Sequence, residues 1–297
     1  MGGVLALSTI LALSLTFASC NNNSNSDDES PSQSLPANVG DNPITDTITL
    51  KTESGRNGDY LELNRDGTAL YFDSDWNETM YKFKYTYDAD AKKIYMQVEK
   101  TLYFGDGDYI YPETTSLMTY NEIISQINKD YTVGNLKKAY DDWGKEDFDS
   151  YTDFEKDVLE GFGVDSFEAY AELIKDYYKA IFSPQVTYSY KTENGKMTLT
   201  EKFTGVKNML NSSCAYSSNG TWCSIWSDTA SFAEYNDGKW VYYYGTPDTG
   251  KIAFRNEDDG SIVPATYTEN ISAETVTIKF KDKEYVCEFD GTKFTQE

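Results

Sequence analysis

The chain has 297 residues, of which 49 are Asp or Glu and 26 are Lys or Arg, so its formal net charge is −23 at pH 7. A chain this acidic repels nucleic acid and anionic lipid surfaces, which excludes both as electrostatic partners. Histidine is absent, which excludes Ser-His-Asp and Cys-His nucleophilic sites and histidine-ligated zinc, iron or copper.

The N-terminus has an apolar run that ends at a cysteine. Residues 4–18 are apolar or small, and Ser19 and Cys20 follow directly. The run is shorter than the roughly 20 residues of a membrane-spanning helix, and it suits the h-region of a signal peptide over residues 1–19. This small-residue box before a cysteine resembles the signal of bacterial lipoproteins, and Phe17 resembles the looser spirochaete-type boxes. The resemblance implies lipidation of Cys20, and membrane attachment in the cell envelope through its acyl chains. The alternative is an ordinary cleaved signal peptide with Cys20 unmodified.

Residues 20–43 form a polar segment after this signal. Their Asn, Ser, Asp and Pro side chains offer almost nothing to bury, which predicts a disordered tether. A coil of this length spans roughly 25–30 Å, enough to hold a folded body clear of lipid head groups. We therefore expect the folded body to begin at residue 44.

Most of the body predicts short antiparallel strands. Residues 80–87 alternate aromatic side chains with Lys and Thr, which is the period of a half-buried strand. Turn residues separate three pairs of such segments, at 60–63 and 69–72, 186–190 and 197–199, and 276–280 and 285–289. Short strands with turns every 8 to 12 residues are typical of an antiparallel barrel or sandwich.

One segment of the body, residues 115–183, changes to a helical period of 3.6. Capping boxes predict the helix starts, at Thr119 with Glu122, Thr152 with Glu155, and Asp165 with Glu168. The segment 165–182 is predicted to be a helix whose apolar stripe consists of Phe167, Tyr170, Leu173, Ile174, Tyr177, Tyr178 and Ile181. We expect a two- or three-helix insert that packs on the β body; the alternative is a partner-binding arm.

The strands on either side of this insert suggest two β domains. The expected boundaries are 44–204, including the insert, and 205–297; the alternative is one continuous β domain. The second part has Gly220-Thr221-Trp222, followed by an Asp237-Gly238 turn. This pattern resembles bacterial lipocalin-like or calycin-like lipoprotein domains, which are small antiparallel barrels. The resemblance implies that Trp222 plugs the closed end of the second barrel, with Trp240 as the competing candidate, and that an apolar ligand binds inside.

The predicted fold class is therefore mainly β with an α-helical insert, arranged as antiparallel calycin-like barrels or a β-sandwich after a signal peptide and a disordered tether.

The cysteines suggest structural roles. Cys214 and Cys223 lie in a turn-rich stretch, and we expect them to form a disulfide in an oxidising envelope. Alternation in residues 285–289 places Cys287 with Tyr285 and Phe289 on a core face, where we expect it to stay reduced. No local base is evident that would make any of the three catalytic.

Acidic residues and tyrosines are the remaining candidates for a site. The acidic runs at 73–78, 106–108 and 256–260 match no EF-hand loop, and we interpret them as solvated turns rather than metal sites. The chain has 25 tyrosines, and residues 240–244 place aromatic rings on both faces of one strand. Some of these rings are expected to face water, where they suit protein or glycan contacts; the alternative is aromatic packing in a small barrel.

These observations predict a lipid-anchored, non-enzymatic envelope protein that binds a small apolar ligand or a protein partner without a cofactor. The alternative is a glycoside hydrolase that uses carboxylates and acts on envelope or host glycans. A closed apolar cavity favours the binding protein, whereas two carboxylates about 5–10 Å apart in an open cleft favour the hydrolase.

Overall fold

The computed structural model describes residues 31, 34–52, 58–75, 77–103, 116–142 and 144–296. The expected signal peptide, Cys20 and the acidic run at 106–108 lie outside these residues. The described residues of 102–179, which are mostly helical, form one compact unit, and those of 31–101 and 180–296, which are mostly in strands, form another.

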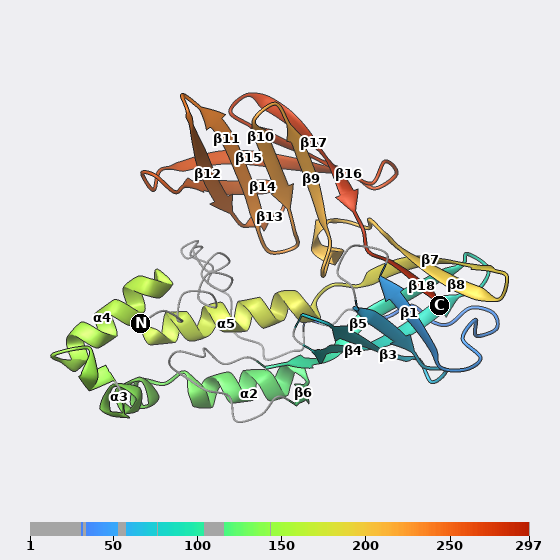
Figure 1. Ribbon diagram of the computed structural model, residues 1–297, viewed down its shortest axis with the longest axis horizontal. Coiled ribbons are helices and arrows are strands. Elements are labelled where there is room, and N and C mark those ends of the chain that lie inside the picture. The colour runs from blue at the N-terminus through green and yellow to red at the C-terminus, as the bar shows by residue number, and fades with distance from the viewer. Residues whose placement is uncertain are drawn as a thin grey trace. The chain divides into compact units, whose positions relative to one another are not determined.

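The first barrel is a closed ring of eight antiparallel strands (Figure 1). Each strand pairs with the next one along the chain, and the last pairs with the first, which is the up-and-down arrangement. The strands are β1 (Ile48–Thr52), β2 (Tyr60–Leu63), β3 (Thr68–Asp73), β4 (Glu78–Asp88), β5 (Lys93–Leu102), β7 (Val186–Glu193), β8 (Lys196–Lys202) and β18 (Lys293–Gln296).

The second barrel has the same topology and lies within the sequence of the first, between β8 and β18. Its ring closes where β17 pairs with β9 and where β12 pairs with β14, and the short strand β13 (Pro247–Asp248) pairs with β14. The ring consists of β9 (Ser213–Ser218), β10 (Thr221–Ile225), β11 (Ala230–Asn236), β12 (Lys239–Gly245), β14 (Lys251–Asn256), β15 (Ile262–Asn270), β16 (Thr275–Phe280) and β17 (Lys283–Asp290).

The predicted barrel fold is confirmed, and all three predicted hairpins form, as β2–β3, β7–β8 and β16–β17. The expected second domain, 205–297, includes the last strand, β18, but the structure places this strand elsewhere. Lys293–Gln296 pairs with β1 and β8, so it belongs to the first barrel. The reason is geometric, since the first barrel needs an eighth strand to close, and only this segment fills the gap between β1 and β8.

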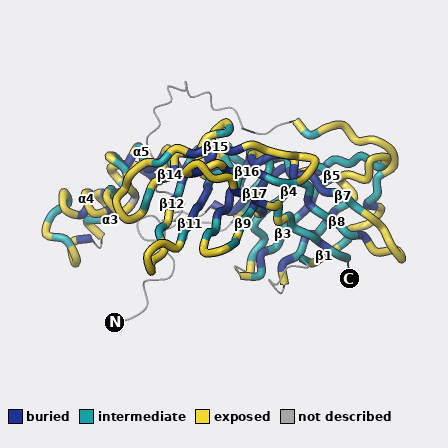
Figure 2. The backbone as a smooth tube through the Cα atoms, turned by 90° about the horizontal axis from the view of Figure 1, so that it is seen from above, coloured by how far each residue is buried: buried dark blue, intermediate teal, exposed yellow. Residues whose placement is uncertain are grey.

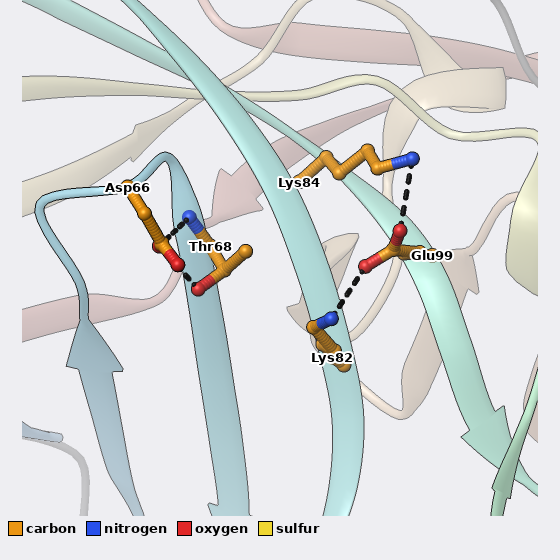
Figure 3. A network of polar contacts seen from close by, with 5 residues as sticks. All are labelled: Asp66, Thr68, Lys82, Lys84 and Glu99. Atoms are coloured by element: carbon orange, nitrogen blue, oxygen red, sulfur yellow. Dashed lines mark hydrogen bonds and ion pairs between the residues drawn. The ribbon is translucent and has the colours of Figure 1, made fainter.

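The strand pairing of the first barrel has two irregularities, one between β3 and β4 and one between β4 and β5. The pairing register skips Met80 on β4 and Glu99 on β5, so each is the extra residue of a β-bulge. The bulged Glu99 carboxylate lies between two lysines of β4, at 2.9 Å from Lys82 Nζ and 2.8 Å from Lys84 Nζ (Figure 3). Burial acts to raise the pKa of Glu99, but the two lysines outweigh it and lower that pKa.

Alternation along the strands fills the interior of both barrels. Buried residues fall mainly on every second position of the strands, while the turns between them are exposed (Figure 2). The second barrel has an aromatic core in which Phe232 contacts Phe280 and Tyr285, with ring centroids 4.6 and 5.1 Å apart. An eight-stranded barrel is just wide enough for side chains to fill, and these rings fill it.

The segment before β1 is more ordered than the predicted tether. Val39 forms a bridge with Asp88, and its backbone exchanges hydrogen bonds of 2.9 Å with Tyr87 and Ala89. The Asn38 side chain accepts a hydrogen bond from the Tyr87 amide. The prediction of disorder up to residue 43 is therefore wrong for this part, because the Val39 backbone and the Asn38 side chain hydrogen-bond to the backbone at the end of β4.

The described part of the insert contains four α-helices, more than the two or three predicted. They are α2 (Tyr120–Asp130), α3 (Val133–Asp142), α4 (Tyr151–Phe162) and α5 (Phe167–Phe182), accompanied by the 3-10 turn Gly144–Glu146 and the short strand β6 (Leu117–Met118). None of the described helices is long and apolar enough to cross a membrane.

The first predicted helix cap is confirmed, and the other two are displaced. Thr119 and Glu122 form the expected capping box of α2. Ser150, rather than Thr152, caps α4, and the Ser166 hydroxyl, rather than Asp165, accepts the Ala169 amide at the start of α5. In both cases the serine is the residue immediately before the first residue of its helix, which is the N-cap position.

The stripe on α5 is largely as predicted. Phe167, Tyr170, Ile174 and Tyr178 are buried, whereas Leu173 and Ile181 are half-buried and Tyr177 is exposed. The buried rings contact others of the same unit, with Tyr131 5.4 Å from Tyr170 and Tyr103 5.8 Å from Tyr178 between centroids. Ala171 and Phe182, which the prediction left out, are also buried.

The stripe predicts a large effect of Ile174→Asp, which places a charge at a site that is 4% exposed. We expect a loss of more than about 3 kcal/mol of stability, because the carboxylate has no partner there. Thermal melts followed by the helical circular dichroism signal measure it. Glu172→Ala, on the exposed face of the same helix, is the control and should cost less than about 1 kcal/mol. Equal melting of the two variants would contradict the assignment.

The Glu99 bridge predicts a loss of stability in acid. The pKa of Glu99 in the folded protein lies below its ordinary value. The ionised Glu99 therefore stabilises the fold fully at pH values above the pKa of the unfolded chain. This stabilisation disappears as the pH falls through the pKa of the folded state. Glu99→Gln should lower stability at pH 7 by roughly 0.5–1 kcal/mol and cost progressively less in acid. Urea unfolding from pH 2 to 7 tests this, with the exposed Glu193→Gln as control. A cost that does not depend on pH would contradict it.

Candidate functional site

The interior of the first barrel has one small cavity of about 30 Å³ among the described residues. Its lining is mostly apolar and comes from seven of the strands and from the chain segments that precede β9 and β18. The lining residues are Leu61, Tyr71, Phe83, Met96, Val186, Tyr188, Glu201, Leu210, Asn211, Thr292 and Phe294. The volume suits about two water molecules, and it is far below the roughly 300–1,000 Å³ of pockets for larger ligands.

Glu201 is the one ionisable carboxylate in this lining, and it is 5% exposed. Its Oε1 accepts a hydrogen bond of 2.7 Å from the Ser212 hydroxyl, and its Oε2 accepts one of 3.0 Å from the Thr292 amide. Burial raises the pKa of Glu201, although the hydrogen bonds from Ser212 and Thr292 oppose the rise. Since Ser212 precedes β9 and Thr292 precedes β18, one side chain ties both connections between the barrels.

Two tyrosines complete the polar part of the cavity. Burial, and then the nearby Glu201, raise the pKa of Tyr188 well above its ordinary value. Tyr71 donates a hydrogen bond of 3.0 Å to Asp59, which also accepts the Ser74 amide at 2.8 Å. Burial, and then Asp59, raise the pKa of Tyr71. Both phenols therefore stay neutral, and both buried carboxylates are already hydrogen-bonded by their own chain.

Sequence reasoning missed Glu201, although a signal was present. Met197 and Leu199 alternate inward along β8, and Glu201 continues the same phase. A carboxylate in phase with core residues is a candidate buried group.

A group of exposed rings lies on the outer face of the second barrel. Tyr235, Trp240 and Tyr242 on β11 and β12 are 52, 43 and 40% exposed. The centroids of Tyr235 and Trp240 are 5.5 Å apart, and those of Trp240 and Tyr242 are 6.3 Å apart. We call these three residues the aromatic face. The prediction that some rings of 240–244 are exposed is confirmed, while Tyr243 is buried in the core.

Acidic residues surround the aromatic face. Asp237 is in the β11–β12 turn, and the exposed Glu257 donates its amide to the Tyr242 carbonyl. Asp258, also exposed, forms an ion pair of 2.8 Å with Lys239. The border of the aromatic face is therefore mostly negative.

Trp222 does not plug the second barrel, and neither does Trp240. In the β10–β11–β12 register, Trp222 lies opposite Ala233, which lies opposite the exposed Tyr242. The adjacent row, Cys223, Phe232 and Tyr243, is the buried one. The prediction fails because a one-residue shift in strand phase exchanges the two faces.

The cysteines are arranged differently from the predicted Cys214–Cys223 disulfide. All three are buried free thiols. Cys214 lies opposite Ile225 and Cys223 lies opposite Tyr216, so the expected partners are offset by two positions on neighbouring strands. The Cys223 sulfur instead lies 3.3 Å from the Cys287 sulfur.

The acidic runs behave as turns where the structure describes them. In the 256–260 run, Asn256 Oδ1 accepts the Asp258 amide and Asp259 Oδ1 accepts the Ser261 amide, at 2.8 and 2.9 Å. The described part of the chain has no group of three or more Cys, Asp or Glu residues that could hold a metal ion.

Comparison of the chain with protein-family models, with curated proteins and with solved structures found no match.

The environment of Glu201 predicts a decline of stability with pH. The pKa of Glu201 is higher in the folded protein than in the unfolded chain, where a glutamate has its ordinary pKa of about 4.3. The free energy of unfolding therefore falls as the pH rises from about 4.3 through the pKa of the folded state. Glu201→Gln is neutral throughout and should lack this decline. Urea unfolding between pH 4 and 8 measures the difference, with the exposed Glu284→Gln as control. Parallel curves for wild type and Glu201→Gln would show that Glu201 does not titrate abnormally.

Proposed function

We propose that this is a non-enzymatic, envelope-anchored binding protein that contacts a protein partner through the aromatic face of its second barrel. The observation that supports this most is the exposure of three adjacent rings, Tyr235, Trp240 and Tyr242. Exposed tyrosine and tryptophan are the residues most enriched in the energetic centres of protein interfaces.

Binding of an apolar ligand inside a barrel has less support than binding of a partner on the outer surface. The cavity of the first barrel, at about 30 Å³, is too small for a ligand larger than a few atoms. In the second barrel Phe232, Phe254 and Phe280 pack against one another with centroids 4.6 to 6.3 Å apart. Because the interiors are filled, binding on the outer surface is favoured.

The charge around the aromatic face indicates the chemistry of the partner. Asp237, Glu257 and Asp258 border the rings, and the whole chain has a net charge of −23. A partner surface with Lys or Arg would meet this border favourably, and a cation placed over the face of Trp240 or Tyr242 gains a further roughly 0.5–2 kcal/mol. The proposed partner is therefore a basic protein surface.

The proposed anchor rests on the N-terminal pattern alone. The apolar run that ends at Cys20 favours an acylated cysteine, and the polar residues after it favour a short spacer. An acyl anchor suits a chain this acidic, which gains no attraction from anionic lipid.

The alternative, a glycoside hydrolase, needs two carboxylates across a substrate cleft. The buried carboxylates of the described chain, Asp59, Asp73 and Glu201, each accept hydrogen bonds from neighbouring backbone or hydroxyl groups. Only Glu201 lines the cavity, and that cavity does not admit a sugar ring. The geometry favours binding over hydrolysis.

The aromatic face predicts the effect of the double variant Trp240→Ala/Tyr242→Ala on binding of a basic probe. The probe is a fluorescent decapeptide of alternating Arg and Ser, whose anisotropy is followed while the purified protein is titrated in. We expect the double variant to bind at least tenfold more weakly, because it loses both rings without any change in charge. Val286→Ala, a change at another exposed apolar residue of the same barrel, should bind like wild type.

Two outcomes would contradict this proposal. Equal affinity of the double variant and wild type would mean that only the net charge attracts the peptide. Binding of a neutral chito-oligosaccharide that resists salt and is lost in the double variant would assign the aromatic face to glycans instead.

A further inference from the structure

Two cysteines of the second barrel meet across its interior. Cys223 is on β10 and Cys287 is on β17, and both are completely buried. The strand β9 pairs with both of these strands, so β10 and β17 are not neighbours in the sheet. Their sulfur atoms nevertheless lie 3.3 Å apart, which is a contact between thiols rather than the roughly 2.05 Å bond of a disulfide.

We propose that Cys223 and Cys287 form the structural disulfide of the second barrel when the protein matures in an oxidising compartment. This inference uses only the envelope location from the proposed function and is independent of the aromatic face. The bond joins residues 64 positions apart in the sequence, so it constrains most of the second barrel.

The third cysteine stays a thiol in this arrangement. Cys214 lies on β9 opposite Ile225, away from the in-register position of Cys223. The contact that selects the pair is the 3.3 Å between the sulfurs of Cys223 and Cys287. In the folded barrel, burial and then the neighbouring Cys287 raise the pKa of Cys214 to about 12, so this thiol stays unreactive once the barrel has formed. The pairing of Cys223 with Cys287 therefore replaces the short Cys214–Cys223 loop expected from spacing.

The reaction is thiol–disulfide exchange with a disulfide oxidant. The thiolate of one cysteine attacks a small-molecule disulfide RSSR, forming a mixed disulfide and releasing one RSH. The thiolate of the other cysteine then attacks the protein sulfur and releases the second RSH. Two thiol hydrogens and two electrons pass to the oxidant, which is reduced to two thiols.

Burial decides when this exchange takes place. Both thiols are 0% exposed, and their mutual contact and burial raise the pKa of Cys223 far above its ordinary value. The folded barrel therefore exchanges slowly, and the bond forms while the chain is still folding. Once formed, it should resist reductant until the barrel unfolds.

The experiment maps disulfides in full-length protein in which Cys20 is replaced by serine, so that three thiols remain. One sample comes from a bacterial periplasm, and a second is refolded from reduced, unfolded chain with glutathione disulfide. We expect a cross-linked peptide pair containing Cys223 and Cys287 in unreduced digests of both samples. Alkylation in denaturant without reductant, before digestion, should label only Cys214, which is buried in the folded barrel.

Variants separate this bond from a structural effect of the cysteines. Cys214→Ala should keep the cross-link, whereas Cys223→Ala and Cys287→Ala should remove it. Reduction in denaturant followed by refolding without oxidant should lower the melting temperature of wild type and of Cys214→Ala by about 10 °C. It should leave the melting temperatures of the other two variants unchanged.

Three results would decide against parts of the inference. A peptide pair of Cys214 with Cys223 would overturn the pairing, and so would free thiols at positions 223 and 287 in both samples. A cross-link in the refolded sample but not in the periplasmic one would keep the pairing and refute its formation in the envelope. None of these results depends on whether the aromatic face binds a partner.

Discussion

The arrangement of the strands depends on one constraint, the place where the chain leaves the first barrel and returns to it. β8 ends at Lys202 and β18 begins at Lys293, and the whole second barrel lies between them. The Glu201 amide donates to the Thr292 carbonyl, and the Glu201 carboxylate accepts from Thr292 and Ser212. One buried residue therefore fixes both crossings. The insertion is tolerated because a closed up-and-down barrel pairs its first strand with its last, so that its two ends emerge side by side, as Ser213 and Asp290 do.

The junction is reinforced from the second barrel by carboxylates that meet backbone donors. Glu274 accepts the Phe203 amide and pairs with Lys202, and Glu269 accepts the Val206 amide. Phe203, Val206 and Met209 belong to the core of the second barrel although they precede its first strand. The chain between β8 and β9 is thus part of that core rather than a free linker. The folded second barrel holds its two ends together at Ser213 and Asp290, and so brings β18 back next to β8 and β1.

The sequence predicts which side chains of a strand point toward the core better than it predicts which strands pair with each other. Alternation located β2, β3, β4, β7, β8, β16 and β17, because a period of two reports which side chains point inward. It could not place β18, whose partner Leu50 is 246 positions from Gln296, because periodicity holds no information about distant pairing. The same limit explains the cysteines. The spacing of Cys214 and Cys223 suggested a short loop, while the register across β9 brings Cys223 to Cys287. Glu201 was predictable from its phase, but its two partners were not.

The filled interiors leave the outer surface of the barrels as the place for the proposed contact with a partner. An eight-stranded barrel has room for its own side chains or for one small ligand, and aromatic rings occupy that room in the second barrel. Aromatic residues on alternate positions of β12 then serve two purposes. Tyr243 packs inward against Phe232 and Phe280, while Trp240 and Tyr242 point outward from the same strand. The exposed rings project from a strand that is paired on both sides, with β11 and with β14, so its backbone has little freedom to lose on contact with the proposed partner. The same strand thus contributes one ring to the core and two rings to the proposed binding surface.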